Sequence, residues 1–316
     1  MENRHTTVLL KESIESLGVR PGDVAVDATL GAAGHFREFA IALGNTGTLV
    51  GIDADPESIV RAQEAAAEFA GKGPTTHLVN DNFRNLGRIL DDLGISCLDR
   101  ALFDLGWNTN QLEEGRGFSF RADEPLLMTY GEPEEGKTAA DLVNSLPEGE
   151  LADLIYNYGE ERFSRGIARS IVETRRRERI VTTKQLAEAV EQGTPSWYHH
   201  RRIHPATKTF QALRIATNDE LGALRDGLTA AMDRLTQGGR IAVITFHSIE
   251  DRIVKSFMKD AAYAGRGSVV TRKPVIPSES ELSANPRARS AKLRVFERCN
   301  GEDVCITKPA SVHLYV

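Results

Sequence analysis

Two groups of residues near the start of the chain have the types and spacing that a nucleoside-binding site needs. The first is the turn Thr29-Leu30-Gly31-Ala32-Ala33-Gly34, which follows an apolar segment and precedes a helical pattern beginning at His35. Small residues in such a turn let the backbone pass close to a ligand before the helix starts. The second is Asp53, which ends the next apolar segment and could accept hydrogen bonds from both hydroxyls of an adenosine ribose.

Two further groups follow the next two apolar segments. In Asp81-Asn82-Phe83, a polar side chain could pair with an adenine edge while Phe83 covers the face of the ring. Asp104-Leu105-Gly106-Trp107 would lie beside the reacting centre. Plainer interpretations exist, because the glycine turn could serve only helix packing, Asp53 could cap a helix before Pro56, and Phe83 could belong to the core. In chain order, with each group at a strand end, the four together indicate an adenosine cofactor.

The elements that must position these groups alternate between strand and helix patterns. Segments predicted as buried strands are 23–28, 47–53, 77–79 and 101–104. Helical patterns between them are 35–43, 59–69 and 86–93. Such alternation predicts βαβ units in a doubly wound α/β sheet, whose ligand site lies at the carboxyl ends of the strands.

The middle third of the chain breaks this pattern. Residues 107–205 hold no convincing buried strand, and their helical patterns are around 139–145, 148–157, 161–176 and 183–191. A long amphipathic helix over 207–235 then returns the chain to the sheet, with strands at 239–246, 269–271 and 293–297. We therefore predict one doubly wound domain, 1–106 and 206–316, interrupted by a helical insertion, 107–205.

The turn Gly31-Ala32-Ala33-Gly34 bears on which adenosine cofactor fits. The dinucleotide fingerprint G-x-G-x-x-G has more glycines at a different spacing, because a pyrophosphate needs several exposed backbone amides. The turn here has a single pair of glycines. It favours the methionine end of S-adenosylmethionine over NAD.

Composition favours a cytoplasmic protein whose contacts with nucleic acid are local. The 316 residues carry a net charge of -6 and the sequence pI is ≈ 5.8, which counts against nonspecific coating of nucleic acid. No apolar run approaches the roughly 20 residues of a membrane span, and the three cysteines lack the spacing of a metal site. We expect no membrane segment and no metal. Two basic clusters, 175–179 and 199–208, could contact RNA, although a charged run is more often a solvated helix face.

Longer motifs carry a family resemblance. They are DATLG (27–31), GIDAD (51–55), GFSF (117–120), HPATKTFQALRI (204–215), FHSIEDRIVK (246–255) and NPRARSAKLR (285–294). Over nearly its whole length the chain resembles the bacterial 16S rRNA cytosine-N4 methyltransferases (RsmH, also called MraW). The resemblance implies a class I (Rossmann-like) S-adenosylmethionine-dependent methyltransferase sheet, with the helical insertion as a substrate-recognition domain. It also implies methyl transfer to the exocyclic N4 amine of a cytidine near the decoding centre, with 16S rRNA or the small ribosomal subunit as partner and the oligomeric state left open.

The resemblance also assigns site residues. Cofactor contacts carry over to Ala33, Gly34, His35, Asp53, Phe83, Asp104 and Gln111, of which Gln111 rests on the resemblance alone. For catalysis we hypothesise that Asp104, or the carbonyl of Leu105, accepts a hydrogen bond from the amine. Trp107 could stack on an extruded cytosine or pack under the insertion. The candidates for phosphate contact are Arg175, Arg176, Arg201, Arg202, Arg287 and Arg289.

Three segments depart from the usual pattern of the family. Ala32 and Ala33 stand where further glycines are usual, and Trp107-Asn108-Thr109-Asn110 precedes Gln111 where residues are usually small and polar. Leu127-Met128-Thr129-Tyr130 replaces a run of an acidic residue, Met, Arg and Met. These departures leave two alternatives open: a noncatalytic ribosome-assembly factor, and a methyltransferase of another RNA or of protein.

Overall fold

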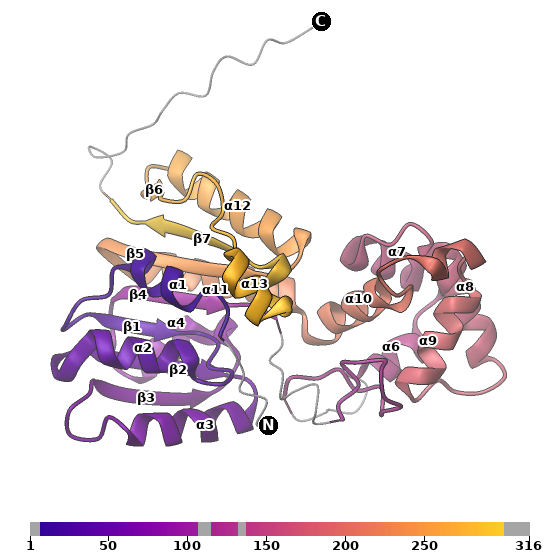
Figure 1. Cartoon of the computed structure of the whole chain (residues 1–316), viewed down its shortest axis with the longest axis horizontal. Coiled ribbons are helices and arrows are strands. Elements are labelled where there is room, and N and C mark those ends of the chain that lie inside the picture. The colour runs from indigo at the N-terminus through magenta and orange to yellow at the C-terminus, as the bar shows by residue number, and fades with distance from the viewer. Residues whose placement is uncertain (1–6, 107–114, 132–136, 300–316) are drawn as a thin grey trace, which may run out of the picture.

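The fold is built on a seven-stranded sheet with the order β3-β2-β1-β4-β5-β7-β6 (Figure 1). It comes from a computed structural model, which describes residues 7–106, 115–131 and 137–299. The strands are β1 (Val24–Asp27), β2 (Thr48–Asp53), β3 (Thr75–Asn80), β4 (Leu98–Asp104), β5 (Leu235–Thr245), β6 (Ser268–Val269) and β7 (Lys292–Glu297). The strands from β3 to β5 pair in parallel, while β7 is antiparallel to both of its neighbours. The predicted doubly wound α/β class is confirmed.

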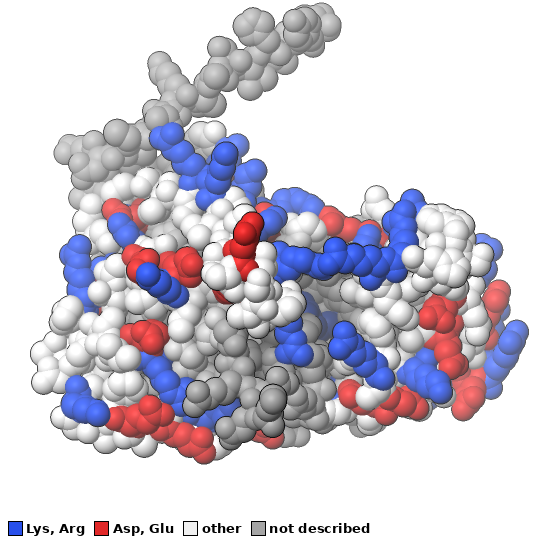
Figure 2. Space-filling view, in the orientation of Figure 1, with Lys and Arg blue, Asp and Glu red and all other residues white. Residues whose placement is uncertain are grey.

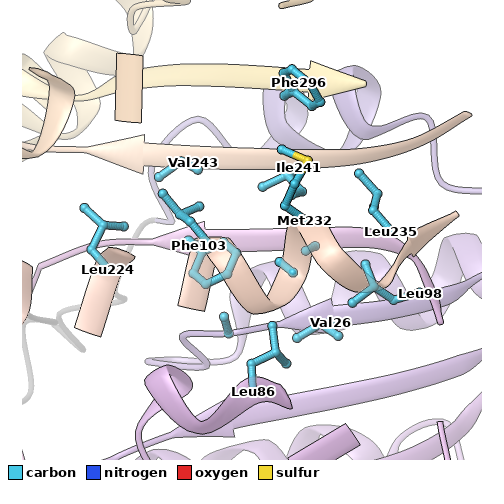
Figure 3. Close-up of a cluster of buried hydrophobic side chains, with 14 of the residues drawn as sticks. Val26, Leu86, Leu98, Phe103, Leu224, Met232, Leu235, Ile241, Val243 and Phe296 are labelled. Carbon is cyan, nitrogen blue, oxygen red and sulfur yellow. The ribbon is translucent and has the colours of Figure 1, made fainter. Parts of the chain in front are cut away.

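Helices cover both faces of the sheet, because the strands carry apolar side chains on both faces. On one face, Ala25 of β1 packs with the helices α1 (Leu10–Leu17), α2 (Gly34–Leu43) and α3 (Pro56–Ala67). On the other, Val26 packs with α4 (Leu86–Asp92), α11 (Glu220–Arg234) and α12 (Ser248–Tyr263). Figure 3 shows Phe103 and Val243 of the sheet in the second cluster with Leu224 and Met232 of α11.

The middle of the chain forms a helical part with a core of its own, set to one side of the sheet (Figure 1). It comprises α6 (Ala139–Ser145), α7 (Glu148–Gly159), α8 (Ser164–Arg175), α9 (Thr183–Gln192), the 3-10 turn η3 (Ser196–His200) and α10 (Ala206–Asn218). Capping boxes start two of these helices: Thr138 pairs with Asp141 at α6, and Thr182 pairs with Gln185 at α9. None of the described helices is both long and apolar enough to cross a membrane.

The long helix predicted over 207–235 is wrong, because the chain turns at Asp219. This residue has a φ of 45°, in the left-handed region, and it ends α10 and begins α11. Phe210 and Leu213 of α10 pack in the core of the helical part, whereas Leu224 and Leu228 of α11 pack under the sheet. The domain division at 205/206 stays a prediction, and α10, which it places with the sheet, packs with the helical part.

Candidate functional site

A cleft of about 830 Å³ lies at the carboxyl ends of the parallel strands, where the sheet domain meets the helical part. Asp53 and Asp104 line it from the sheet, and Phe120, Tyr130 and Phe210 line it from the helical part. The volume is within the range of small-molecule sites. The cleft therefore brings the predicted strand-end groups together with residues of the helical part, among them Phe210, which is more than a hundred positions from both carboxylates.

The turn after β1 is held against the end of β2. The backbone N–H of Gly31 donates to Oδ2 of Asp53 at 2.9 Å, and the N–H of Leu30 donates to the carbonyl of Ile52 at 3.1 Å. Ala33 is buried and has a φ of 61°, a conformation that alanine rarely adopts. A Cβ on Gly34 would lie 1.8 Å from Oγ1 of Thr7, so only glycine fits there. Close packing thus accounts for the glycine at position 34.

Asp53 is positioned by backbone hydrogen bonds. Its Oδ1 accepts from the N–H of Asp55 at 2.9 Å, while Oδ2 accepts from Gly31. Burial raises the pKa of Asp53 to about 6, in opposition to these hydrogen bonds. Each carboxylate oxygen can accept more than one hydrogen bond. A ligand with two hydroxyls can therefore still bind to it.

Asp104 ends β4 on the floor of the cleft. Its backbone N–H donates to Oγ1 of Thr29 at 2.7 Å, and its Oδ2 lies 3.6 Å from Nδ1 of the buried His35. Its buried Oδ1 has no hydrogen-bond partner among the described residues. Burial, and then the charge of Glu250, raise the pKa of Asp104 to about 8. The carboxyl is therefore mostly protonated at neutral pH, and one of its oxygens remains available to a ligand.

Phe83 lies both at the cleft and against the core, which are the two positions considered for it from the sequence. It lines the cleft, and its ring also lies edge-on to Phe103 in the core, with centroids 5.6 Å apart. Asn82 before it accepts from the N–H of Arg84 at 3.0 Å and so caps the short turn η2 (Phe83–Asn85). The turn fixes the ring at the edge of the cleft.

A buried ionic network on the opposite wall is absent from the sequence-based predictions. Arg214 donates to both carboxylate oxygens of Glu220, at 2.7 and 2.9 Å, and the hydroxyl of Tyr130 donates to Oε1 of the same residue at 2.9 Å. Nearby, His247 and Glu250 form a capping box at the start of α12. The only sequence signals for this network are that Arg214, His247 and Glu250 lie in two of the long motifs.

The same wall contains a group of residues close enough to share a cation. Potential ligand atoms of Glu220, His247 and Glu250 lie within 4.8 Å of one another. Both oxygens of Glu220 already accept hydrogen bonds from Arg214. The arrangement therefore favours an ion-pair network over a metal site.

The predicted phosphate-binding arginines have different environments. Arg175 donates to the carbonyl oxygens of Val143 at 2.6 Å and Leu146 at 2.7 Å, so it closes the end of α6. Arg176, Arg201 and Arg202 are exposed.

The last two predicted arginines belong to the segment between β6 and β7, residues 270–291, which we call the late loop. Arg287 lines the cleft, while Arg289 is exposed beside it and lines a smaller neighbouring pocket. Figure 2 shows Lys and Arg side chains lying across the junction of the two parts. Trp107 and Gln111 lie outside the described residues.

Comparison with known proteins gives a family match and close relatives. The model of the MraW methylase family matches residues 2–299. Ribosomal RNA small subunit methyltransferase H of Deinococcus radiodurans is 49% identical over 295 residues, which cover 93% of this chain and 89% of that protein. The protein of the same name from Brevibacillus brevis is 44% identical over 310 residues, which cover 93% and 98%. A solved structure described as an rRNA methylase from Streptococcus thermophilus aligns with 93% of this chain and 98% of its own, at 10% identity and a TM-score of 0.44.

Proposed function

Because the chain belongs to the MraW methylase family, we propose that it transfers a methyl group from S-adenosylmethionine to the exocyclic N4 amine of a cytidine in 16S rRNA. Relatives named rRNA small subunit methyltransferase H support this choice of substrate. The observation that carries the proposal is the buried Oδ1 of Asp104, which has no partner among the described residues and belongs to the same cleft as Asp53. A buried acceptor without a partner costs free energy unless a ligand donates to it.

The residues of the cleft fit the cofactor. Asp53 would hold the ribose hydroxyls and Phe83 the adenine, while the turn at Ala33 and Gly34 would pass close to the methionine end. When bound, S-adenosylmethionine supplies a methyl group on a cationic sulfur. A cation beside Asp104 would favour the ionised carboxylate and lower its pKa from about 8.

Asp104 would also act on the acceptor amine. The lone pair of a cytosine amine is delocalised into the ring, so the nitrogen is a poor nucleophile. A carboxylate that accepts a hydrogen bond from the amine favours the nucleophilic form and stabilises the positive charge that develops on the nitrogen. The stacking role of Trp107 stays a prediction.

The RNA would contact the helical part and the late loop. Arg176, Arg201 and Arg202 are exposed and have no ion-pair partner in the described part of the chain, so they can neutralise phosphates. Arg287 lines the cleft itself, and Arg289 lies beside it. This surface would hold the RNA while one base enters the cleft.

The test uses small subunits from cells that lack this gene, purified protein and methyl-labelled S-adenosylmethionine. Nuclease digestion and mass spectrometry should find N4-methylcytidine at one position of the 16S rRNA. Label on another RNA or on protein would contradict the proposed substrate and identify a different one. Cofactor binding by calorimetry without any transfer would contradict the proposal and support the noncatalytic assembly-factor alternative.

A further inference from the structure

Trp197 is an exposed aromatic residue with a rigid support. It lies in η3 and is 50% exposed. Its ring lies edge-on to Phe163 and to Tyr198, with centroids 5.8 Å away in both cases. Tyr198 is itself buried, and its hydroxyl donates to Oε2 of the buried Glu161 at 2.7 Å. The indole is thus held from beneath and presents its remaining surface to water.

Two arginines flank this indole. The guanidinium carbon of Arg162 lies 4.8 Å from the ring centroid of Trp197, and that of Arg201 lies 5.4 Å away. Both side chains are exposed, and neither forms an ion pair with any described residue. The next residue, Arg202, is also exposed and without such a partner. The patch therefore combines a half-exposed indole, which two guanidinium groups contact, with exposed arginines that form no ion pair with a described residue.

We propose that Trp197, with Arg162 and Arg201, is a stacking site for an unpaired nucleotide of the RNA substrate, outside the cleft. Proteins bind single-stranded RNA by stacking bases on aromatic rings and pairing arginines with the adjacent phosphates. The patch supplies both groups: Trp197 and Arg201 belong to one short segment, and Arg162 joins them from the turn before α8. The inference rests on the proposed function, because it takes RNA as the substrate.

The chain connects this patch directly to the cleft. His204 follows two residues after Arg202, and its ring stacks on Phe120 with centroids 4.5 Å apart. Phe120 lines the cleft, as do Thr207 and Phe210 at the start of α10. An RNA strand whose target base enters the cleft can therefore place a nearby nucleotide against Trp197.

Fluorescence can test the stacking directly, because the chain has only two tryptophans, Trp107 and Trp197. In a Trp107→Phe variant, single-stranded oligocytidylate should quench the emission of Trp197 saturably. An abasic oligonucleotide of the same length carries the same phosphates, and it should bind without comparable quenching. Equal quenching by both probes, or RNA binding seen by anisotropy with no quenching, would overturn the proposal.

Substitutions test the energetics. Trp197→Ala should weaken binding of the oligonucleotide by about 5- to 100-fold, and Trp197→Phe should retain most of the affinity. Arg162→Gln and Arg201→Gln should each lower the salt dependence of binding by about one ion. The matched control is Tyr263→Ala, because Tyr263 is 59% exposed and has Lys259 at 5.3 Å from its ring, but it lies on α12. This control should bind RNA like the parent.

Activity separates this proposal from the proposed function. In methylation of small subunits, Trp197→Ala should raise KM for the subunit and leave kcat and the affinity for S-adenosylmethionine unchanged. A loss that appears with small subunits but not with free RNA would assign the patch to a ribosomal protein and overturn the proposal. If the parent protein methylates no rRNA, the proposed function fails while the quenching experiment still decides whether Trp197 stacks on a base.

Discussion

The carboxyl ends of the strands and the helical part differ in the ionisable groups that they present to a ligand. At the strand ends, Asp53 and Asp104 are half-buried, and burial raises their pKa values to about 6 and about 8. On the helical part, Arg162, Arg201 and Arg202 are exposed and unpaired among the described residues. Half-buried carboxyls suit a small cationic ligand, and exposed arginines suit a polyanion. Under the proposed function, the sheet domain would bind the cofactor and the helical part would bind the RNA.

The sheet domain also contains arginines, so the difference between the two regions does not come from which residue types they contain. Arg100 pairs with Asp23 at 3.0 Å, and Arg240 pairs with Glu297 at 2.6 Å. These pairs bind together elements that are distant in sequence. These two arginines therefore have a structural role beside the sheet, whereas those around η3 are exposed and form no ion pair with a described residue.

The largest expected effect is that of Asp104→Asn on stability, and it tests the strand ends alone. The folded pKa of Asp104 is about 8, against an ordinary 3.8. Between those two values the unfolded chain is ionised at this position while the folded chain stays protonated, so the free energy of unfolding falls as pH rises. Asp104→Asn removes this titration. At about pH 8 it should be more stable than the parent, by at most about 5 kcal/mol for a shift of about four pKa units.

Urea unfolding at about pH 5 and about pH 8 measures this difference. The excess stability of Asp104→Asn should shrink toward the lower pH and vanish near the ordinary pKa. If the two proteins keep a constant difference across this range, Asp104 does not have the raised pKa on which the comparison depends.

The same variant should lose activity, because an amide cannot supply the negative charge of a carboxylate. We expect kcat for methyl transfer to fall by roughly 10²- to 10³-fold, with a smaller change in cofactor affinity. Single-turnover kinetics with small subunits measures the step. Asp92→Asn is the matched control, because Asp92 is an exposed carboxylate that pairs with Arg88 on α4. Full turnover by Asp104→Asn would remove Asp104 from catalysis.

Asp53 tests the cofactor side of the comparison. Asp53→Ala removes an acceptor for the ribose hydroxyls and also releases the N–H of Gly31. Affinity for S-adenosylmethionine should fall by about 1.5 to 3 kcal/mol, measured by calorimetry. Binding of oligocytidylate should not change. A variant that loses both affinities equally would argue against separate binding regions.

The smallest expected effect concerns two adjacent arginines on the helical part. Arg175→Gln removes two hydrogen bonds to the carbonyls of Val143 and Leu146, so it should lower the free energy of unfolding by about 1 to 2 kcal/mol. Arg176→Gln should leave stability within about 0.5 kcal/mol and lower only the salt dependence of RNA binding. Thermal unfolding and salt titrations separate the two. The reverse assignment of effects would show that position 176, and not 175, is structural.

The strands and the cleft carboxylates could be predicted from sequence because their signals are local. A buried apolar run followed by Asp53 or Asp104 identifies both a strand and its carboxyl end, and the topology brings these ends together. The turn in the long helix at Asp219 could not be predicted in the same way. Its amphipathic pattern continues through the residue, and only the backbone angle changes.

Sequence-based prediction also could not identify which residues pair with one another. Tyr130 and Glu220 are 90 positions apart, so no local pattern relates them. Arg175 and Arg176 are identical in type and adjacent, yet one closes a helix end and the other faces water. The sequence shows where charge is located, whereas the packing of the helical part decides which charges are already paired.

The position of S-adenosylmethionine in a crystal of the protein would test the central claim most directly. The account predicts the ribose hydroxyls on Asp53, the sulfur beside Oδ1 of Asp104 and the adenine against Phe83. A cofactor bound outside this cleft, or one that leaves Oδ1 of Asp104 without any ligand or substrate group near it, would contradict the account.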